Sequence, residues 1–160
     1  MAGPEQQVAE EEPTPEEESK TLVRREFERL DAQSDMFDWQ LRILDAGDYF
    51  VILARIEKGP DRVFVEKLVC DDYGPLAPAA VFIDPTLFES ADDNTPGERQ
   101  FYPAGEQIDN REPLPRVCIK GHRDYYAENW HGGWSDPPGH EHTLYQHVVN
   151  VRNAILENWT

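Results

Sequence analysis

The chain has 160 residues, 39% of them hydrophobic, and a formal net charge of −17. This length suits one domain with a substantial core. Such an acidic surface argues against nucleic acid and anionic membranes as partners and favours a basic partner. No apolar run approaches the roughly 20 residues of a membrane-spanning helix, and the acidic start lacks the pattern of a signal peptide. With two cysteines, we expect reduced thiols and a location in the cytoplasm.

An acidic tail comes first. Residues 1–13 contain almost nothing apolar, so they cannot offset their ordering entropy and are predicted to be disordered. The folded domain is predicted over residues 14–160. It begins with a helix over 15–33, because Thr14 and Glu17 have the spacing of a capping box. Apolar residues then recur at helical spacing, at Val23, Phe27 and Leu30.

Four β-strands are predicted next, over residues 38–44, 49–56, 62–70 and 79–84. The first strand alternates, with Trp39, Leu41 and Ile43 on one side, and the second is a nearly continuous apolar run. Turn residues separate the first three strands and predict a hairpin. A run of strands after one helix indicates an antiparallel four-stranded meander, and therefore an α+β fold.

Regularity disappears over residues 85–115, which are rich in Asp, Gly and Pro. A long loop of this kind in a compact domain is often functional. The last predicted element is a helix over 144–156, with Thr143 as its cap. Its apolar stripe consists of Leu144, Val148, Val151 and Ile155.

Cys118 is the residue most suited to chemistry, because it lies between β-branched residues where a predicted strand gives way to a loop rich in Gly, Trp and His. A thiolate can accept an acyl group and pass it to an amine. The basic neighbours Arg116, Lys120 and His122 would favour the thiolate form. Residue type alone leaves a second possibility, a small buried strand residue. Cys70 lies within a predicted core strand and fits that second role.

Three more residues would complete an acyl-transfer site around Cys118. The amide of Asn110 can donate a hydrogen bond to the oxyanion of a tetrahedral intermediate. Asp124 or Asp136 can orient an incoming lysine or take its proton. The predicted catalytic residues are therefore Cys118, Asn110, His122, Asp124 and Asp136.

Several motifs resemble the ubiquitin-conjugating enzymes. The segment with Asp72, Tyr73 and Pro78 resembles the family's Asp-Tyr-Pro…Pro-Pro link, although Gly74 replaces one proline and Ala77 another. Val117-Cys118-Ile119 resembles the apolar-Cys-Leu active-site segment, and Trp134-Ser135-Asp136-Pro137 resembles the family's Trp-Ser-Pro. With the order of predicted elements, the resemblance covers about residues 15–157. The loop-rich C-terminal half is more similar to divergent prokaryotic members than to eukaryotic ones.

The resemblance implies a transferase of the ubiquitin-conjugating fold, with an N-terminal helix, a four-stranded meander, a long active-site loop and a C-terminal helix. Such a protein accepts a ubiquitin-like protein from an activating enzyme as a thioester on Cys118 and transfers it to a target amine. No cofactor is implied. The family's His-Pro-Asn is absent, with Asn110 alone at its spacing, and the interval from Cys118 to Trp134 is longer than usual. A non-catalytic adaptor that binds a ubiquitin-like protein therefore stands as the alternative.

A metal site is a weaker possibility, built from His122, His131, His140 and His142. Structural zinc sites show paired ligands at tight spacings such as Cys-x2-Cys, and this chain has none. We therefore expect no metal, and a metal-dependent hydrolase remains only a third hypothesis.

Overall fold

The computed structural model describes residues 11–60, 62–94 and 143–158. Residues 1–10, most of the predicted tail, lie outside this range. The described elements, in chain order, are α1 (Pro15–Asp31), α2 (Ser34–Phe37), β1 (Trp39–Asp45), β2 (Phe50–Lys58), β3 (Arg62–Val69), β4 (Ala79–Ile83), α3 (Leu87–Ser90) and α5 (Leu144–Asn158). The α+β class is confirmed, as are the N-terminal helix, the four strands and the C-terminal helix.

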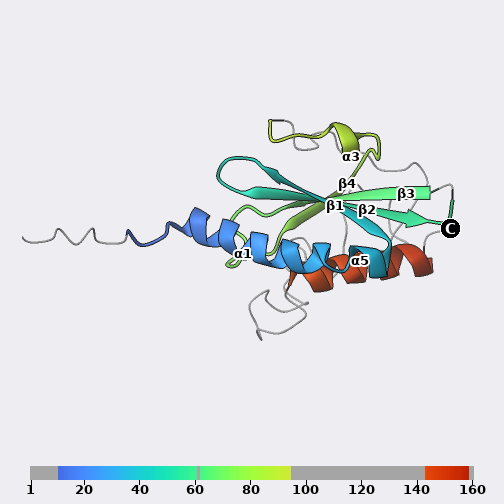
Figure 1. The fold of residues 1–160 in the computed structure, drawn as a ribbon, viewed down its shortest axis with the longest axis horizontal. Coiled ribbons are helices and arrows are strands. Elements are labelled where there is room, and N and C mark those ends of the chain that lie inside the picture. Colours follow the sequence, from blue (N-terminus) through green and yellow to red (C-terminus); the bar gives the residue numbers. More distant parts are fainter. Residues whose placement is uncertain (1–10, 61, 95–142, 159–160) are drawn as a thin grey trace, which may run out of the picture.

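The four strands form one antiparallel sheet in the order β1-β2-β3-β4. Each strand pairs with the next one along the chain, so the predicted meander is confirmed. Figure 1 shows α1 and α5 along one face of the sheet, with α3 on the opposite side. Residues of α1 and α5 are in contact, although the two helices come from opposite ends of the described chain.

Both faces of the sheet are buried. The first core cluster lies between the sheet and the helices α1 and α5, and includes Ile52, Ala54 and Ile56 of β2. The second lies on the α3 side and includes the alternate β2 residues Val51 and Leu53. Side chains along a strand point to opposite faces in turn. The continuous apolar run of β2 is therefore explained by burial on both faces, as in a central strand.

Two short helices replace segments predicted to be irregular. The break expected after residue 33 is a single helical turn, α2, which ends at Asp38 in the left-handed conformation with φ of 53°. Phe37 of this turn stacks on Trp39 with ring centroids 4.6 Å apart. Within the predicted 85–115 loop, α3 places Phe88 in the second core cluster. In both places, packing of an aromatic ring stabilises a turn that local sequence does not specify.

The link between β3 and β4 contains the glycine that departs from the family pattern. Gly74 has a φ of +114°, and Asp72 has a φ of +56°. A proline is held near −65° and cannot adopt the Gly74 conformation, whereas glycine adopts it readily. The link therefore follows a path here that a proline at position 74 would not allow.

The predicted starts of the first and last helices are confirmed by their caps, whereas their last residues are Asp31 and Asn158 in place of the predicted 33 and 156. Thr14 Oγ1 accepts a hydrogen bond from the Glu17 N–H, and the Glu17 carboxylate accepts one from the Thr14 N–H, both at 3.2 Å. At α5, Thr143 Oγ1 accepts from the Gln146 N–H at 3.1 Å. The predicted stripe of α5 is buried in the first core cluster. Among the described residues, no helix has both the length and the apolar character required to cross a bilayer.

Candidate functional site

All five predicted catalytic residues, Asn110, Cys118, His122, Asp124 and Asp136, lie outside the described residues. The same holds for the other histidines of the hypothetical metal site. The structure therefore neither brings these side chains together nor separates them. It does describe the framework on both sides of the 95–142 segment, and three buried or networked polar groups in that framework.

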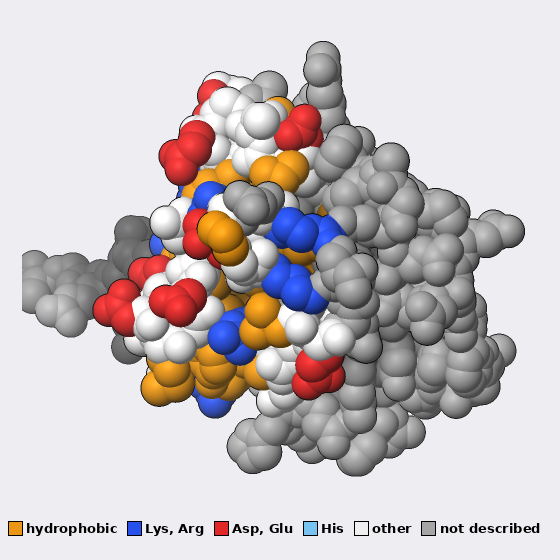
Figure 2. Space-filling model, turned by 90° about the vertical axis from the view of Figure 1, so that its right-hand side faces the viewer, with side chains coloured by type: hydrophobic (Ala, Val, Ile, Leu, Met, Phe, Trp, Pro, Cys, Tyr) orange, Lys and Arg blue, Asp and Glu red, His pale blue; other side chains and the backbone are white. Residues whose placement is uncertain are grey.

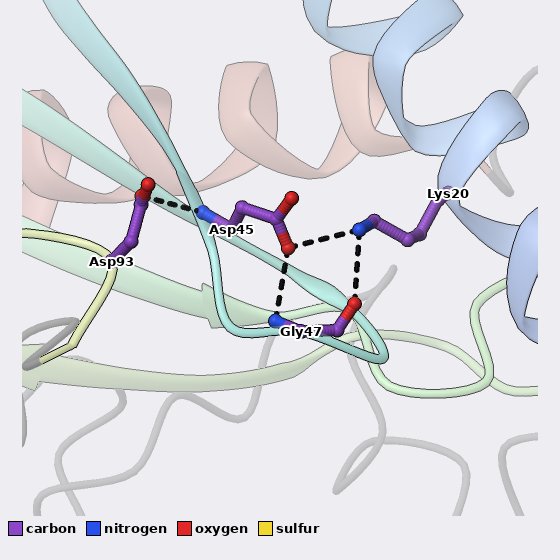
Figure 3. A network of polar contacts seen from close by, with 4 residues as sticks. All are labelled: Lys20, Asp45, Gly47 and Asp93. Carbon is purple, nitrogen blue, oxygen red and sulfur yellow. Dashed lines mark hydrogen bonds and ion pairs between the residues drawn. The ribbon is translucent and has the colours of Figure 1, made fainter.

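Asp93 ties the chain just before this segment to the turn between β1 and β2 (Figure 3). Its carboxylate accepts a hydrogen bond from the Asp45 N–H at 2.8 Å. The Asp45 carboxylate accepts from Lys20 Nζ and from the Gly47 N–H, both at 2.9 Å. These two hydrogen bonds hold the pKa of Asp45 below its ordinary value, and the one from Lys20 has the larger effect. Helix α1, the turn and the segment after α3 therefore share one polar network.

Glu26 ties down the chain just after the 95–142 segment. Its Oε1 accepts hydrogen bonds from the Tyr73 hydroxyl and from the Leu144 N–H, both at 2.9 Å. Burial raises the pKa of Glu26, although these two hydrogen bonds and the nearby charge of Arg29 act in the opposite direction. Burial and the Glu26 carboxylate also raise the pKa of Tyr73. One carboxylate thus joins α1, the β3–β4 link and the first turn of α5.

A third polar contact lies inside the core. Glu66 is in β3, opposite Ala54 and Phe82, and His147 is in the first turn of α5. The Nε2 of His147 lies 2.9 Å from Glu66 Oε2, and both side chains are 0% exposed. Glu66 Oε1 has no hydrogen-bond partner in the described part of the protein. Because both side chains are fully buried, the pair is placed to hold α5 against the sheet and not to meet a substrate at the surface.

Cys70 is completely buried directly after β3, as its place in a predicted core strand implied. Its Sγ faces the Leu68 carbonyl oxygen at 3.8 Å. A thiol in this position packs as a small apolar side chain. It is not accessible to a protein substrate.

Surface hollows in the described part are lined by polar and charged residues and contain no nucleophilic cysteine. One hollow of about 700 Å³ lies beside the start of β1 and the end of β2, and Asp38, Arg55 and Glu57 contribute charges to it. An acidic hollow of about 330 Å³ is lined by Glu16, Asp48, Tyr49, Asp71 and Asp72. Within the described ranges, no group of three or more His, Cys, Asp or Glu side chains has the arrangement of a metal site.

Positive charge is concentrated locally despite the net charge of −17. Figure 2 shows the face on the right of Figure 1, where Lys and Arg side chains gather in the middle among hydrophobic ones. Acidic side chains lie around them on the same face.

Sequence analysis did not identify Glu26, Glu66 or His147 as important residues. Two of them had a detectable pattern. Glu66 lies two residues from both Phe64 and Leu68, so it shares their buried face. His147 lies three residues after Leu144, on the apolar side of α5. A charged residue in phase with a core stripe indicates a buried partner, although the sequence does not identify that partner.

Comparison with known proteins provides no relative from which to assign a function, since no family model matches the chain and a search of curated proteins finds no significant match.

Proposed function

We propose that the chain is a ubiquitin-conjugating-like transferase that carries a ubiquitin-like protein as a thioester on Cys118. The observation that carries this proposal is the order of elements. An N-terminal helix precedes a sequential four-stranded antiparallel meander, and a helix follows the segment that contains Cys118. The motifs around Tyr73, Cys118 and Trp134 add support from the sequence. An α+β meander occurs in many proteins, so the motifs are needed beside the order of elements to favour this function over others.

The proposed reaction has two transfers. In the first, the Cys118 thiolate attacks the thioester carbonyl carbon of the ubiquitin-like protein held by an activating enzyme, and the activating enzyme's thiolate leaves. In the second, a target amine attacks the new thioester, loses a proton, and the Cys118 thiolate leaves. Asn110 would hydrogen-bond the oxyanion formed in each step. His122 would favour the thiolate, and Asp124 or Asp136 would orient the amine or accept its proton. A reducing compartment such as the cytoplasm keeps the thiol available.

The framework residues have a supporting role in this proposal. Asp93 and Glu26 hold the chain within two residues of either end of the 95–142 segment. A scaffold that holds the ends of a segment reduces the number of conformations available to the residues between them. Tyr73, part of the motif that resembles the family, contributes through its hydrogen bond to Glu26.

A direct test mixes the protein with activating enzyme, ATP and a ubiquitin-like protein, and looks for an adduct that a reducing agent removes. Cys118→Ser should abolish this adduct. The matched control is Cys70→Ser, which should keep the adduct because Cys70 is buried in the core. That variant should also be less stable by about 1–3 kcal/mol, because it places a more polar hydroxyl in a fully buried, largely apolar site. Loss of the adduct in Cys70→Ser but not in Cys118→Ser would overturn the assignment.

The absence of His-Pro-Asn favours a non-catalytic adaptor as the second candidate. The reactivity of Cys118 separates the two functions. If the protein is an enzyme, iodoacetamide should alkylate Cys118 near neutral pH at least as fast as it alkylates an unstructured peptide thiol. In the His122→Ala variant, alkylation of Cys118 should be slower than in the wild type. Asn110→Ala should leave alkylation unchanged but slow transfer to lysine by about a hundredfold. Alkylation far slower than that of the peptide would favour the adaptor.

A further inference from the structure

The stripe that packs α5 on the sheet is aliphatic, and contacts of aliphatic side chains are non-directional. Its buried stripe consists of Leu144, Val148, Val151 and Ile155, each at most 1% exposed. Contacts among such side chains tolerate small rotations and translations of a helix, because burial depends on area and not on angle. A core of suitable size and polarity loses a unique arrangement before it loses stability.

The polar contacts at the ends of α5 are not selective for one position of the helix. Lys58 Nζ donates to the Ile155 carbonyl oxygen at 2.9 Å, and Arg152 Nε donates to the Phe37 carbonyl oxygen at 3.0 Å. Long basic side chains can follow a carbonyl that moves. Glu26 accepts the backbone N–H of Leu144, a group that every residue except proline carries.

The Glu66–His147 pair differs from all of these contacts. Both partners are side chains, both are fully buried, and their 2.9 Å contact requires one orientation of the imidazole ring. A movement of α5 by 1–2 Å, the size of ordinary helix shifts, would break it. The broken state would leave a carboxylate and an imidazole buried without each other, which is strongly unfavourable. The contact therefore joins one residue of the sheet, Glu66 of β3, to one residue of the helix, His147 of α5.

The pair is an expensive way to fill this space. Glu66 Oε1 is buried without a hydrogen-bond partner among the described residues. A buried polar atom without a hydrogen bond costs free energy that an apolar side chain of similar volume would not. The pair therefore contributes more to the orientation of α5 than to the free energy of unfolding. We propose that the Glu66–His147 pair is a positional lock, which selects one rotation and one axial position of α5 on the sheet.

The lock has a consequence for the whole fold, because α5 begins two residues after the 95–142 segment ends. The position of α5 therefore fixes where Thr143, the first described residue after that segment, lies on the domain. This inference holds whether or not Cys118 forms a thioester, since it concerns only the described residues.

The test compares the wild-type protein with the double variant Glu66→Leu/His147→Leu by methyl NMR. The wild type should give one sharp set of signals for Val148, Val151 and Ile155. The double variant should melt at or above the wild-type temperature, yet show doubled or broadened signals for these methyl groups. Methyl groups of the second core cluster, such as Leu53, serve as an internal control and should stay sharp.

Two further variants make the outcome decisive. Glu66→Gln keeps the shape and one hydrogen bond to His147, and should keep single sharp signals. The exchange Glu66→His/His147→Glu restores a directional pair and should also sharpen the signals relative to the leucine double variant. Sharp single signals in the leucine double variant would overturn the proposal. So would a leucine double variant that unfolds or melts below the wild type, because the pair would then be needed for stability.

Discussion

Removal of the Tyr73 hydroxyl is the most informative single change to the framework. The Tyr73 ring is 2% exposed, and its hydroxyl donates to Glu26 Oε1 at 2.9 Å. In Tyr73→Phe the ring still fills the core, and the change removes the hydroxyl together with its hydrogen bond to the Glu26 carboxylate and its contact with the Leu144 backbone N–H. Such a hydrogen bond contributes about 1.5–3 kcal/mol. We expect the free energy of unfolding near pH 8 to fall by about this amount.

The size of this loss should depend on pH because Glu26 titrates. Burial raises the pKa of Glu26 in the folded state above its ordinary value, while the Tyr73 hydrogen bond lowers it. Without the hydroxyl, the folded-state pKa rises further and the unfolded-state value is unchanged. A raised carboxyl pKa weakens folding above that pKa, and the effect disappears below the unfolded value. The destabilisation by Tyr73→Phe should therefore be larger near pH 8 and should shrink as the pH falls towards the ordinary glutamate value of about 4.3.

Urea denaturation followed by far-ultraviolet circular dichroism, at several values between about pH 8 and about pH 5, measures the difference directly. Tyr49→Phe is the matched control, since Tyr49 is partly buried against the second core cluster and no hydrogen bond of its hydroxyl is found among the described residues. A loss that stays constant with pH, or that grows towards acid pH, would refute the assigned role of Glu26.

Three other results are expected. Ile155→Ala should lower the free energy of unfolding by about 2–5 kcal/mol, because Ile155 is 1% exposed. The control Leu156→Ala, at a residue that is 39% exposed, should lower it far less. Equal losses in the two variants would contradict the described packing of α5. Lys20→Met should raise the pKa of Asp45 towards its ordinary value, because the hydrogen bond from Lys20 is the main cause of its lowering. An NMR titration measures this pKa. An unchanged pKa would show that Lys20 and Asp45 do not form the described network. Deletion of residues 1–13 should barely change the melting temperature, because these residues have no apolar face to bury; a large drop would show that the tail packs on the domain.

Local chemistry accounts for what the sequence predicted well. The capping box at Thr14 and Glu17 forms because its partners are three residues apart. At this spacing each side chain reaches the other residue's backbone N–H once a helix begins there. The stripe of α5 is equally local, since helical geometry alone places its members on one side. The pairing of β1 with β2 and of β2 with β3 also follows from the sequence, because short turns join these strands and favour the pairing of neighbours. The five predicted catalytic residues are also a product of sequence alone, and they remain predictions.

Tertiary structure decided the features that join distant parts of the chain. Glu66 and His147 are 81 residues apart, and Glu26 and Leu144 are 118 apart. A sequence indicates that a charged residue lies in phase with a buried face, but it does not indicate which side chain arrives from the other side of the core. The same is true of α3, whose single turn is held by Phe88 against a sheet face that the sequence pattern left unassigned. Propensity acts over a few residues, whereas burial depends on where every other element lies, and only the folded chain determines that.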